Sequence, residues 1–132
     1  MTNKLNFALG SFIVQAMEDN KIIIESNTND IYSFISLKNL SNLIIGFIFS
    51  KNKMKIHKFD AYDENLSLLD LANKVAITFD IKDLLHDFNN ELTCQLYLGD
   101  NTDYLNLATK LNIQTESLND AILKTIESYK KN

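Results

Sequence analysis

The chain has 132 residues, of which 45% are hydrophobic and 23% charged, and its net charge at neutral pH is −4. This composition can bury a core and excludes a disordered chain. The acidic balance argues against a general nucleic-acid binder, because neutralising phosphates requires clustered Lys or Arg. We therefore expect a single domain over residues 1–132 without a nucleic-acid partner.

Targeting and membrane signals are absent from the sequence. Residues 1–7 lack the charged and apolar regions of a signal peptide, and the longest apolar run, residues 43–49, is too short to span a bilayer. The single cysteine, Cys94, cannot form an intramolecular disulfide, which fits a reducing compartment. These features predict a cytoplasmic protein with no membrane partner.

The first half of the chain predicts one helix followed by strands. Apolar residues at helical spacing predict a helix over residues 5–18. β-branched and apolar runs predict strands over residues 21–26 and 31–37, joined by a polar turn. Residues 43–49 are apolar on both faces, as in a covered central strand, and residues 53–59 alternate like a further strand.

The middle of the chain predicts helical structure in two pieces. Leu66, Leu69 and Ala72 lie on one face of a short amphipathic segment. Asp80 can cap the N-terminus of a second helix that runs through Phe88.

The last third predicts a β-hairpin and a closing helix. Residues 92–98 and 105–113 alternate on either side of a polar turn. Ser117 followed by Asp120 is a variant capping box, and the helix it starts is lined by Leu118, Ile122, Ile126 and Tyr129. The predicted fold class is α+β, an antiparallel sheet flanked by helices in the order α-β-β-β(-β)-α-β-β-α.

Residues with potential chemistry do not form a recognisable active site. The two histidines, His57 and His86, lack the neighbours of a metal-ligand set, and Cys94 lies on the apolar side of its predicted strand. Two acidic groups could hold a hard cation loosely, although helix starts and turns favour the same residues. These groups are Asp60, Asp63 and Glu64, and Asp100 with Asp103. We expect no catalytic residue, metal or cofactor.

A row of lysines is the main basic feature of the sequence. Lys51, Lys53 and Lys55 would lie on one side of the predicted strand over residues 53–59 and its approach. They could bind an acidic partner segment or an anionic ligand. Lysines also protect exposed sheet edges from pairing, which needs no partner.

A family resemblance arises from the C-terminal part. The stretch DLLHDFNNEL at residues 83–92 leads into QLYLGD at residues 95–100, then LNL, LNI and the closing helix. This succession resembles the C-terminal half of the YbjN family and of the type III secretion chaperones that share its fold. The predicted element order is also similar to theirs.

The resemblance implies a non-catalytic protein, usually a homodimer, that binds another polypeptide. The candidate partner contacts are then Phe12, Ile24, Phe34 and Phe47. The candidate dimer contacts are Leu85, Phe88, Leu92 and Leu96. Ordinary core packing is the alternative interpretation for all eight side chains.

Three functional hypotheses follow from the sequence. The first is a chaperone-like or regulatory module that binds a segment of another protein. The second is a small enzyme or ligand-binding protein with a pocket between sheet and helices, in which Asp60, Glu64 or His57 would act. The third is an inhibitor or accessory protein from a mobile element.

Overall fold

A computed structural model describes residues 7–25, 27–50, 58–86, 96 and 98–131. The elements in chain order are α1 (Ala8–Asp19), β1 (Ile22–Ile24), β2 (Ile31–Phe34), α2 (Leu37–Phe49), β3 (Glu64–Ser67), α3 (Leu68–Phe79), β4 (Leu84–His86), α4 (Thr102–Lys110) and α5 (Leu118–Lys130). This content confirms the α+β class. Within the described ranges, every helix is too short or too polar to cross a membrane.

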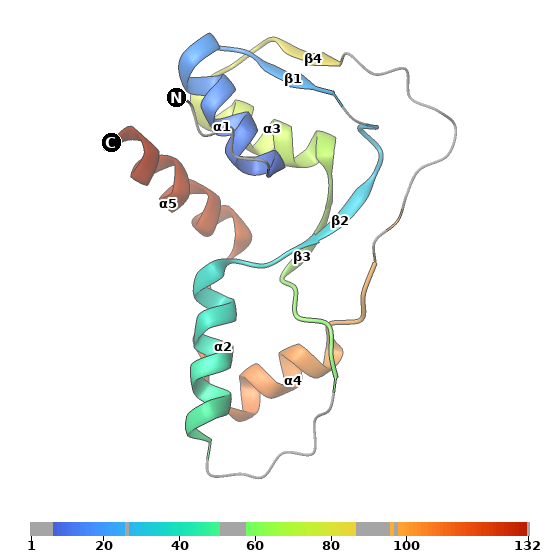
Figure 1. Cartoon of the computed structure of the whole chain (residues 1–132), viewed down its shortest axis with the longest axis vertical. Helices are drawn as coiled ribbons and strands as arrows, with labels where there is room; N and C mark the ends of the chain where they lie inside the picture. The colour runs from blue at the N-terminus through green and yellow to red at the C-terminus, as the bar shows by residue number, and fades with distance from the viewer. Residues whose placement is uncertain (1–6, 26, 51–57, 87–95, 97, 132) are drawn as a thin grey trace.

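The strands form two short ribbons. β1 pairs with β4 in parallel, with Ile22 opposite Leu84. β2 pairs with β3 in antiparallel fashion, and Ile31 lies opposite Ser67. In Figure 1 the β2–β3 ribbon runs from the end that holds α1, α3, β1 and β4 to the end that holds α2 and α4. This ribbon therefore links the two ends of an elongated molecule.

Two apolar clusters hold the fold together. The larger one joins α1, β1, α3 and α5, and its fully buried side chains include Ile13, Ile22, Leu71, Val75 and Ile126. The smaller one lies between α2 and α4 and consists of Leu43, Tyr104, Leu107 and Ala108.

Serine caps start three of the helices. Ser36, Ser67 and Ser117 each accept a hydrogen bond from the backbone N–H three residues on, at the starts of α2, α3 and α5. The Ser117 hydroxyl also donates to the Asp120 carboxylate at 2.8 Å. The predicted closing helix is thus confirmed, including its buried Leu118, Ile122 and Ile126.

The predicted central strand at residues 43–49 is wrong, because these residues belong to helix α2. Ser36 caps the helix at its start, and thirteen residues follow before it ends. A run that is apolar on all sides does not distinguish a strand from a buried helix by periodicity. Here the cap and the length favour the helix. The strand predicted over residues 53–59 lies almost wholly outside the described residues.

The helix predicted to start at Asp80 is also wrong. Asp80 ends α3 in the left-handed conformation, with φ 54°, and its N–H donates to the Ile77 carbonyl. Asp and Asn tolerate this backbone region better than most residues, so an Asp can end a helix as well as start one. Strand β4 follows at Leu84–His86.

The second strand of the predicted C-terminal hairpin is wrong, because helix α4 lies where this strand was expected. Tyr104, Leu107 and Ala108 are buried, a helical spacing, whereas Leu105 is half exposed. The leucines at residues 105 and 107 alternate as in a strand, so the sequence favoured a strand over a helix here. Of the predicted first strand, residues 92–95 and 97 lie outside the described residues.

Candidate functional site

A hollow of about 460 Å³ lies beside the β2–β3 ribbon. Its lining comes from three segments: β2, the loop before β3, and the loop before α4. We call it the Gly99 hollow, and its lining residues are Ser33, Phe59, Asp60, Ala61, Tyr62, Leu98 and Gly99. It therefore combines a hydroxyl, a carboxylate and two aromatic rings.

Polar contacts hold the two loops of the Gly99 hollow together. The Tyr62 hydroxyl donates to the Gly99 carbonyl at 2.8 Å. The Asp100 N–H donates to the Asp60 carboxylate at 3.2 Å, and the Asn101 side-chain amide donates to the Tyr62 carbonyl at 3.1 Å. These bonds cross about 40 residues of sequence, so they fix the shape of the hollow through tertiary structure.

Glycine is required where these loops meet. A Cβ atom built on Gly99 would lie 2.7 Å from the Asp60 carboxylate oxygen and 3.0 Å from the Asp60 Cβ. Any side chain at this position would push Asp60 away. The close approach of backbone to carboxylate is thus specific to a glycine at position 99.

Asp100 forms the turn that begins α4. Its carboxylate accepts hydrogen bonds from the Thr102 N–H at 2.9 Å and the Thr102 hydroxyl at 2.6 Å. The side-chain bond from Thr102, and then its backbone bond, lower the pKa of Asp100. Asp100 is therefore ionised at neutral pH.

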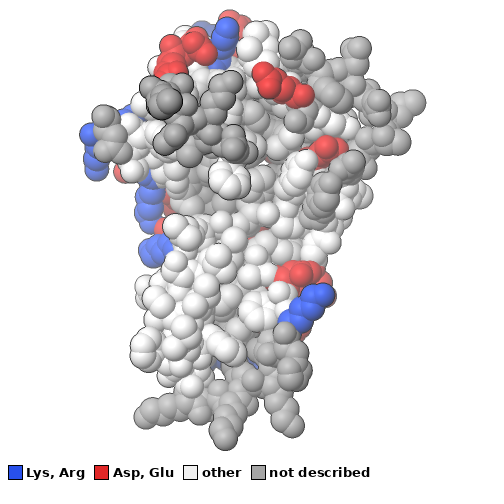
Figure 2. All heavy atoms as spheres, in the orientation of Figure 1, with Lys and Arg blue, Asp and Glu red and all other residues white. Residues whose placement is uncertain are grey.

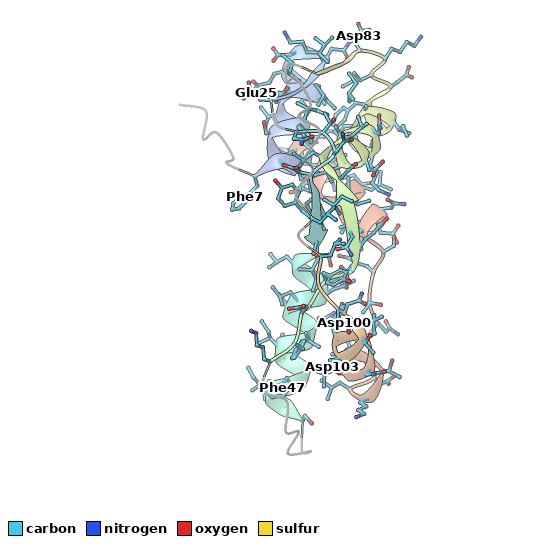
Figure 3. The ribbon with its side chains drawn as sticks, turned by 90° about the vertical axis from the view of Figure 1, so that its right-hand side faces the viewer. Phe7, Glu25, Phe47, Asp83, Asp100 and Asp103 are labelled. Carbon is cyan, nitrogen blue, oxygen red and sulfur yellow. The ribbon has the colours of Figure 1, made fainter. Side chains whose placement is uncertain are left out.

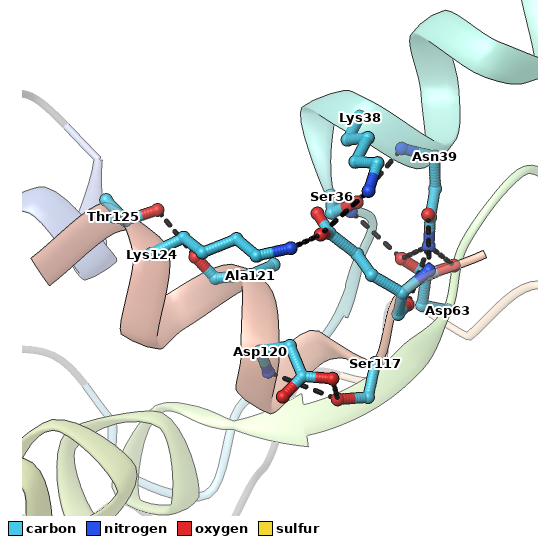
Figure 4. A network of polar contacts seen from close by, with 10 residues as sticks. Ser36, Lys38, Asn39, Asp63, Ser117, Asp120, Ala121, Lys124 and Thr125 are labelled. Carbon is cyan, nitrogen blue, oxygen red and sulfur yellow. Dashed lines mark hydrogen bonds and ion pairs between the residues drawn. The ribbon is translucent and has the colours of Figure 1, made fainter. Parts of the chain in front are cut away.

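A polar network surrounds Asp63, the residue that follows Tyr62 in the chain, and Asp63 accepts several hydrogen bonds there (Figure 4). Its carboxylate accepts from the Ser36 N–H at 2.9 Å, from the Asn39 amide at 3.0 Å and from the Tyr104 hydroxyl at 2.9 Å. Asn39 is fully buried and also bonds both the N–H and the carbonyl of Glu116, at 2.9 Å each. This network joins α2, α4 and the approach to α5.

Burial is the main cause of a raised pKa at Tyr104, and the hydrogen bond to Asp63 raises it further. Tyr104 therefore stays protonated and keeps donating to Asp63. The role of the network is to position the loop before β3, which carries Asp60 and Tyr62.

A second hollow, of about 420 Å³, lies between α5 and the start of α2. Its walls are mostly apolar, and Lys38, Glu116 and Lys124 line it. Both lysines approach one Glu116 carboxylate oxygen, Lys38 at 3.7 Å. The hydrogen bond from Lys124 lowers the pKa of Glu116, and the same bond raises the pKa of Lys124. Glu116 thus balances one of the two lysine charges that line this hollow.

The sequence-predicted partner contacts are scattered. Phe12 and Ile24 are 5% and 1% exposed and belong to the larger core, as the packing interpretation predicted. Phe34 packs partly buried against the same core, and Phe47 is exposed on α2. The lysines of the predicted row, Lys51, Lys53 and Lys55, lie outside the described residues.

Two of the four predicted dimer contacts lie within the described residues. Leu85 and Leu96 are about half exposed, whereas Phe88 and Leu92 lie outside the described residues.

Among the residues with potential chemistry, His57 and Cys94 also lie outside the described residues, and only the backbone of His86 is described. The structure brings together Asp60 and Asp100, which the sequence placed in separate acidic groups. Among the described residues, no three acidic, His or Cys side chains are grouped to hold a metal ion.

Sequence reasoning missed Asn39, Tyr62, Gly99 and Tyr104. Each acts through partners far away in the chain, and no local pattern marks them. A loop glycine in a chain with three glycines was the one available signal.

Comparison with known proteins gives likenesses in structure alone. No protein-family model matches the chain, and no curated protein matches it by sequence. The NAD-dependent NDP-hexosamine 5,6-dehydratase TunA, involved in tunicamycin biosynthesis, shares its fold with a TM-score of 0.72 and 9% identity over 96% of this chain. A GDP-L-fucose synthetase from Naegleria fowleri does so with a TM-score of 0.70 and 12% identity over 98% of it.

The chain spans 40% of the length of each of these two enzymes. The fold defined here is thus the fold of a part of two nucleotide-sugar enzymes. This finding overturns the expectation of a non-catalytic, chaperone-like module that binds another protein, and it favours the alternative of an enzyme or small-ligand-binding protein with a pocket. The resemblance to the YbjN family is not tested by either likeness and stays a prediction.

Proposed function

We propose that this chain forms the sugar-binding part of an enzyme acting on a nucleotide-linked sugar, with the Gly99 hollow as the contact for the sugar. The observation that carries the proposal is the fold likeness, which covers nearly the whole chain in two enzymes of this class. The chemistry of the hollow supports it independently.

The Gly99 hollow suits a ligand that is rich in hydroxyl groups. Asp60 supplies a charged acceptor, Ser33 a hydroxyl, and Phe59 an aromatic surface at its edge. The lining of the hollow is about as polar as it is apolar. Small-molecule sites orient their ligands through a few placed polar groups of this kind. A carboxylate accepts from sugar hydroxyls through two oxygens, and charge-assisted bonds of this kind are the stronger ones.

The charge of the hollow predicts how such a ligand would lie. Asp60 lines the hollow, so a diphosphate placed there would meet a carboxylate. The neutral sugar therefore enters the hollow, and the diphosphate stays outside the rim. Binding should depend more on the sugar than on the nucleotide.

The residues of this chain do not fit the dinucleotide that the name of the dehydratase implies. Binding of NAD by the common strand–loop–helix unit needs a Gly-rich loop. The three glycines are far apart: Gly10 lies in α1, Gly46 in α2 and Gly99 in a loop, none with positive φ. We therefore assign the chain to substrate binding and derive no step through NAD.

Isothermal titration with GDP-L-fucose and a UDP-hexosamine tests the proposal. Asp60→Asn should weaken binding about tenfold, because a charged acceptor is worth about 1.4 kcal/mol more than a neutral one. Asp83→Asn is the matched control, since Asp83 lies at one end of the molecule, far from Asp100 (Figure 3). Equal affinities for the wild type and both variants, or no binding of either ligand to the wild type, would refute the assignment.

A further inference from the structure

The second hollow, between α5 and the start of α2, combines an apolar floor with a charged mouth. The floor includes Leu71 and Ile122, which are 0% and 2% exposed, and Leu9 and Phe34 add partly buried apolar walls. Its volume of about 420 Å³ lies within the range of small-molecule sites. We call it the Glu116 hollow.

Three charged side chains line the Glu116 hollow, namely Lys38, Lys124 and Glu116. The two lysine side chains are 58% and 59% exposed, whereas that of Glu116 is 10% exposed. Both ammonium groups approach the same Glu116 oxygen (Figure 4). Asp120 and Glu127 also act on Lys124, but they do not line the hollow. Two positive charges and one negative charge therefore leave the lining with one positive charge in excess.

Lys38 is the lysine with unused hydrogen-bonding capacity. Its Nζ atom lies 3.7 Å from the Glu116 oxygen, beyond hydrogen-bond distance, and within the described part of the chain this ion pair is its one polar side-chain contact. Lys124, by contrast, donates a hydrogen bond to that oxygen. An ammonium group has three donors, so Lys38 can bind a second anion while Glu116 keeps its place.

The surface beside α5 is basic on the face that Figure 2 shows. Lysine atoms gather along the left edge of this view, at the height at which α5 lies in Figure 1, and little acidic surface is visible between them. The chain as a whole has a net charge of −4, so this is a local feature. Local positive potential attracts anions to the mouth of the hollow.

We propose that the Glu116 hollow binds an aliphatic monocarboxylate, with its apolar chain against Leu71 and Ile122 and its carboxylate beside Lys38. One negative charge matches the excess charge of the lining, whereas a phosphate dianion would exceed it and be repelled by Glu116. The apolar floor favours an unsubstituted chain, because a sugar hydroxyl buried there would lose its hydrogen bonds to water. The proposal does not rest on the function proposed for the Gly99 hollow.

Titration of the isotopically labelled chain with octanoate tests the proposal. We expect saturable amide shifts at Leu37, Lys38, Ala121 and Thr125, which line the hollow. Acetate has the same head without the chain and should bind at least about a hundredfold more weakly, because each buried methylene strengthens binding about fourfold. Octylamine has the same chain length with a positive head and should bind at least about tenfold more weakly than octanoate.

Two variants test the charges separately. Lys38→Met removes the positive charge and keeps an apolar side chain, so the affinity for octanoate should fall about fivefold. Glu116→Gln keeps the backbone bonds to Asn39 and adds to the excess positive charge, so the affinity should rise about fivefold. A purely structural role of Glu116 would lower it instead. Lys110→Met, at the end of α4, is the matched control and should leave the affinity unchanged.

Four outcomes would overturn the proposal. Octanoate and octylamine bind equally well, or the shifts with octanoate map elsewhere or do not saturate. Lys38→Met binds octanoate as the wild type does, or Glu116→Gln binds it more weakly while circular dichroism shows the variant to be folded. If Glu116→Gln does not fold, the comparison of the two ligands and the Lys38→Met variant still decide.

Discussion

The buried network around Asn39 provides the most quantitative prediction. Asn39→Ala removes a hydrogen bond to the Asp63 carboxylate and two bonds to the Glu116 backbone. It keeps the helix cap, because that bond uses the Asn39 backbone N–H. A neutral buried bond contributes about 1 kcal/mol and a charged one about 1.5–3 kcal/mol, so the free energy of unfolding should fall by roughly 3–5 kcal/mol.

Urea denaturation followed by circular dichroism measures this change. Asn119→Ala is the control, because the Asn119 side chain is exposed and accepts one bond from Lys74. Its effect should stay within about 0.5 kcal/mol, as for most surface substitutions. A loss below about 1 kcal/mol for Asn39→Ala would show that the network does not hold the two ends of the fold together.

Three further predictions concern single side chains. Gly99→Ala should weaken sugar binding about tenfold or more, measured by titration, because the new Cβ displaces Asp60; unchanged affinity would contradict the geometry of the hollow. Gly46→Ala should change the free energy of unfolding by less than about 1 kcal/mol, because the better helix propensity of Ala offsets the close contact with the flexible end of the Ile113 side chain. A large loss of stability in thermal unfolding would contradict this balance. Tyr104 has a raised pKa, so its protonated form stabilises the folded state: this contribution is present below pH about 10 and is lost as pH rises through and above that value. Unfolding curves of Tyr104→Phe should show a smaller loss between pH 9 and 11 than the wild type, and parallel losses would refute the assignment.

The sequence predicted those elements whose signals are local. Helix α5 has its Ser117 cap and a regular apolar face, and the isoleucines of β1 favour a strand. By contrast, α2 is apolar all round, and the leucines of α4 alternate by coincidence with a strand period. Where two periods fit the same residues, tertiary packing decides between them.

The candidate site was largely beyond prediction from one sequence. Asn39 and Asp63 are 24 residues apart, and Asp63 and Tyr104 are 41 apart. Asp60 was named as a candidate for its charge, but its contact with the loop at Gly99 depends on the fold. Such sites arise from long-range contacts, which no local pattern of residues records.

Amide chemical-shift mapping of the isotopically labelled chain during titration with GDP-L-fucose and a UDP-hexosamine tests the central claim most directly. If the chain binds the sugar in the Gly99 hollow, saturable shifts will concentrate at Ser33, Ala61, Tyr62 and Gly99, and free GDP or UDP will reproduce few of them. Shifts confined to the hollow beside Lys124, or no saturable shifts with either nucleotide sugar, would contradict the account.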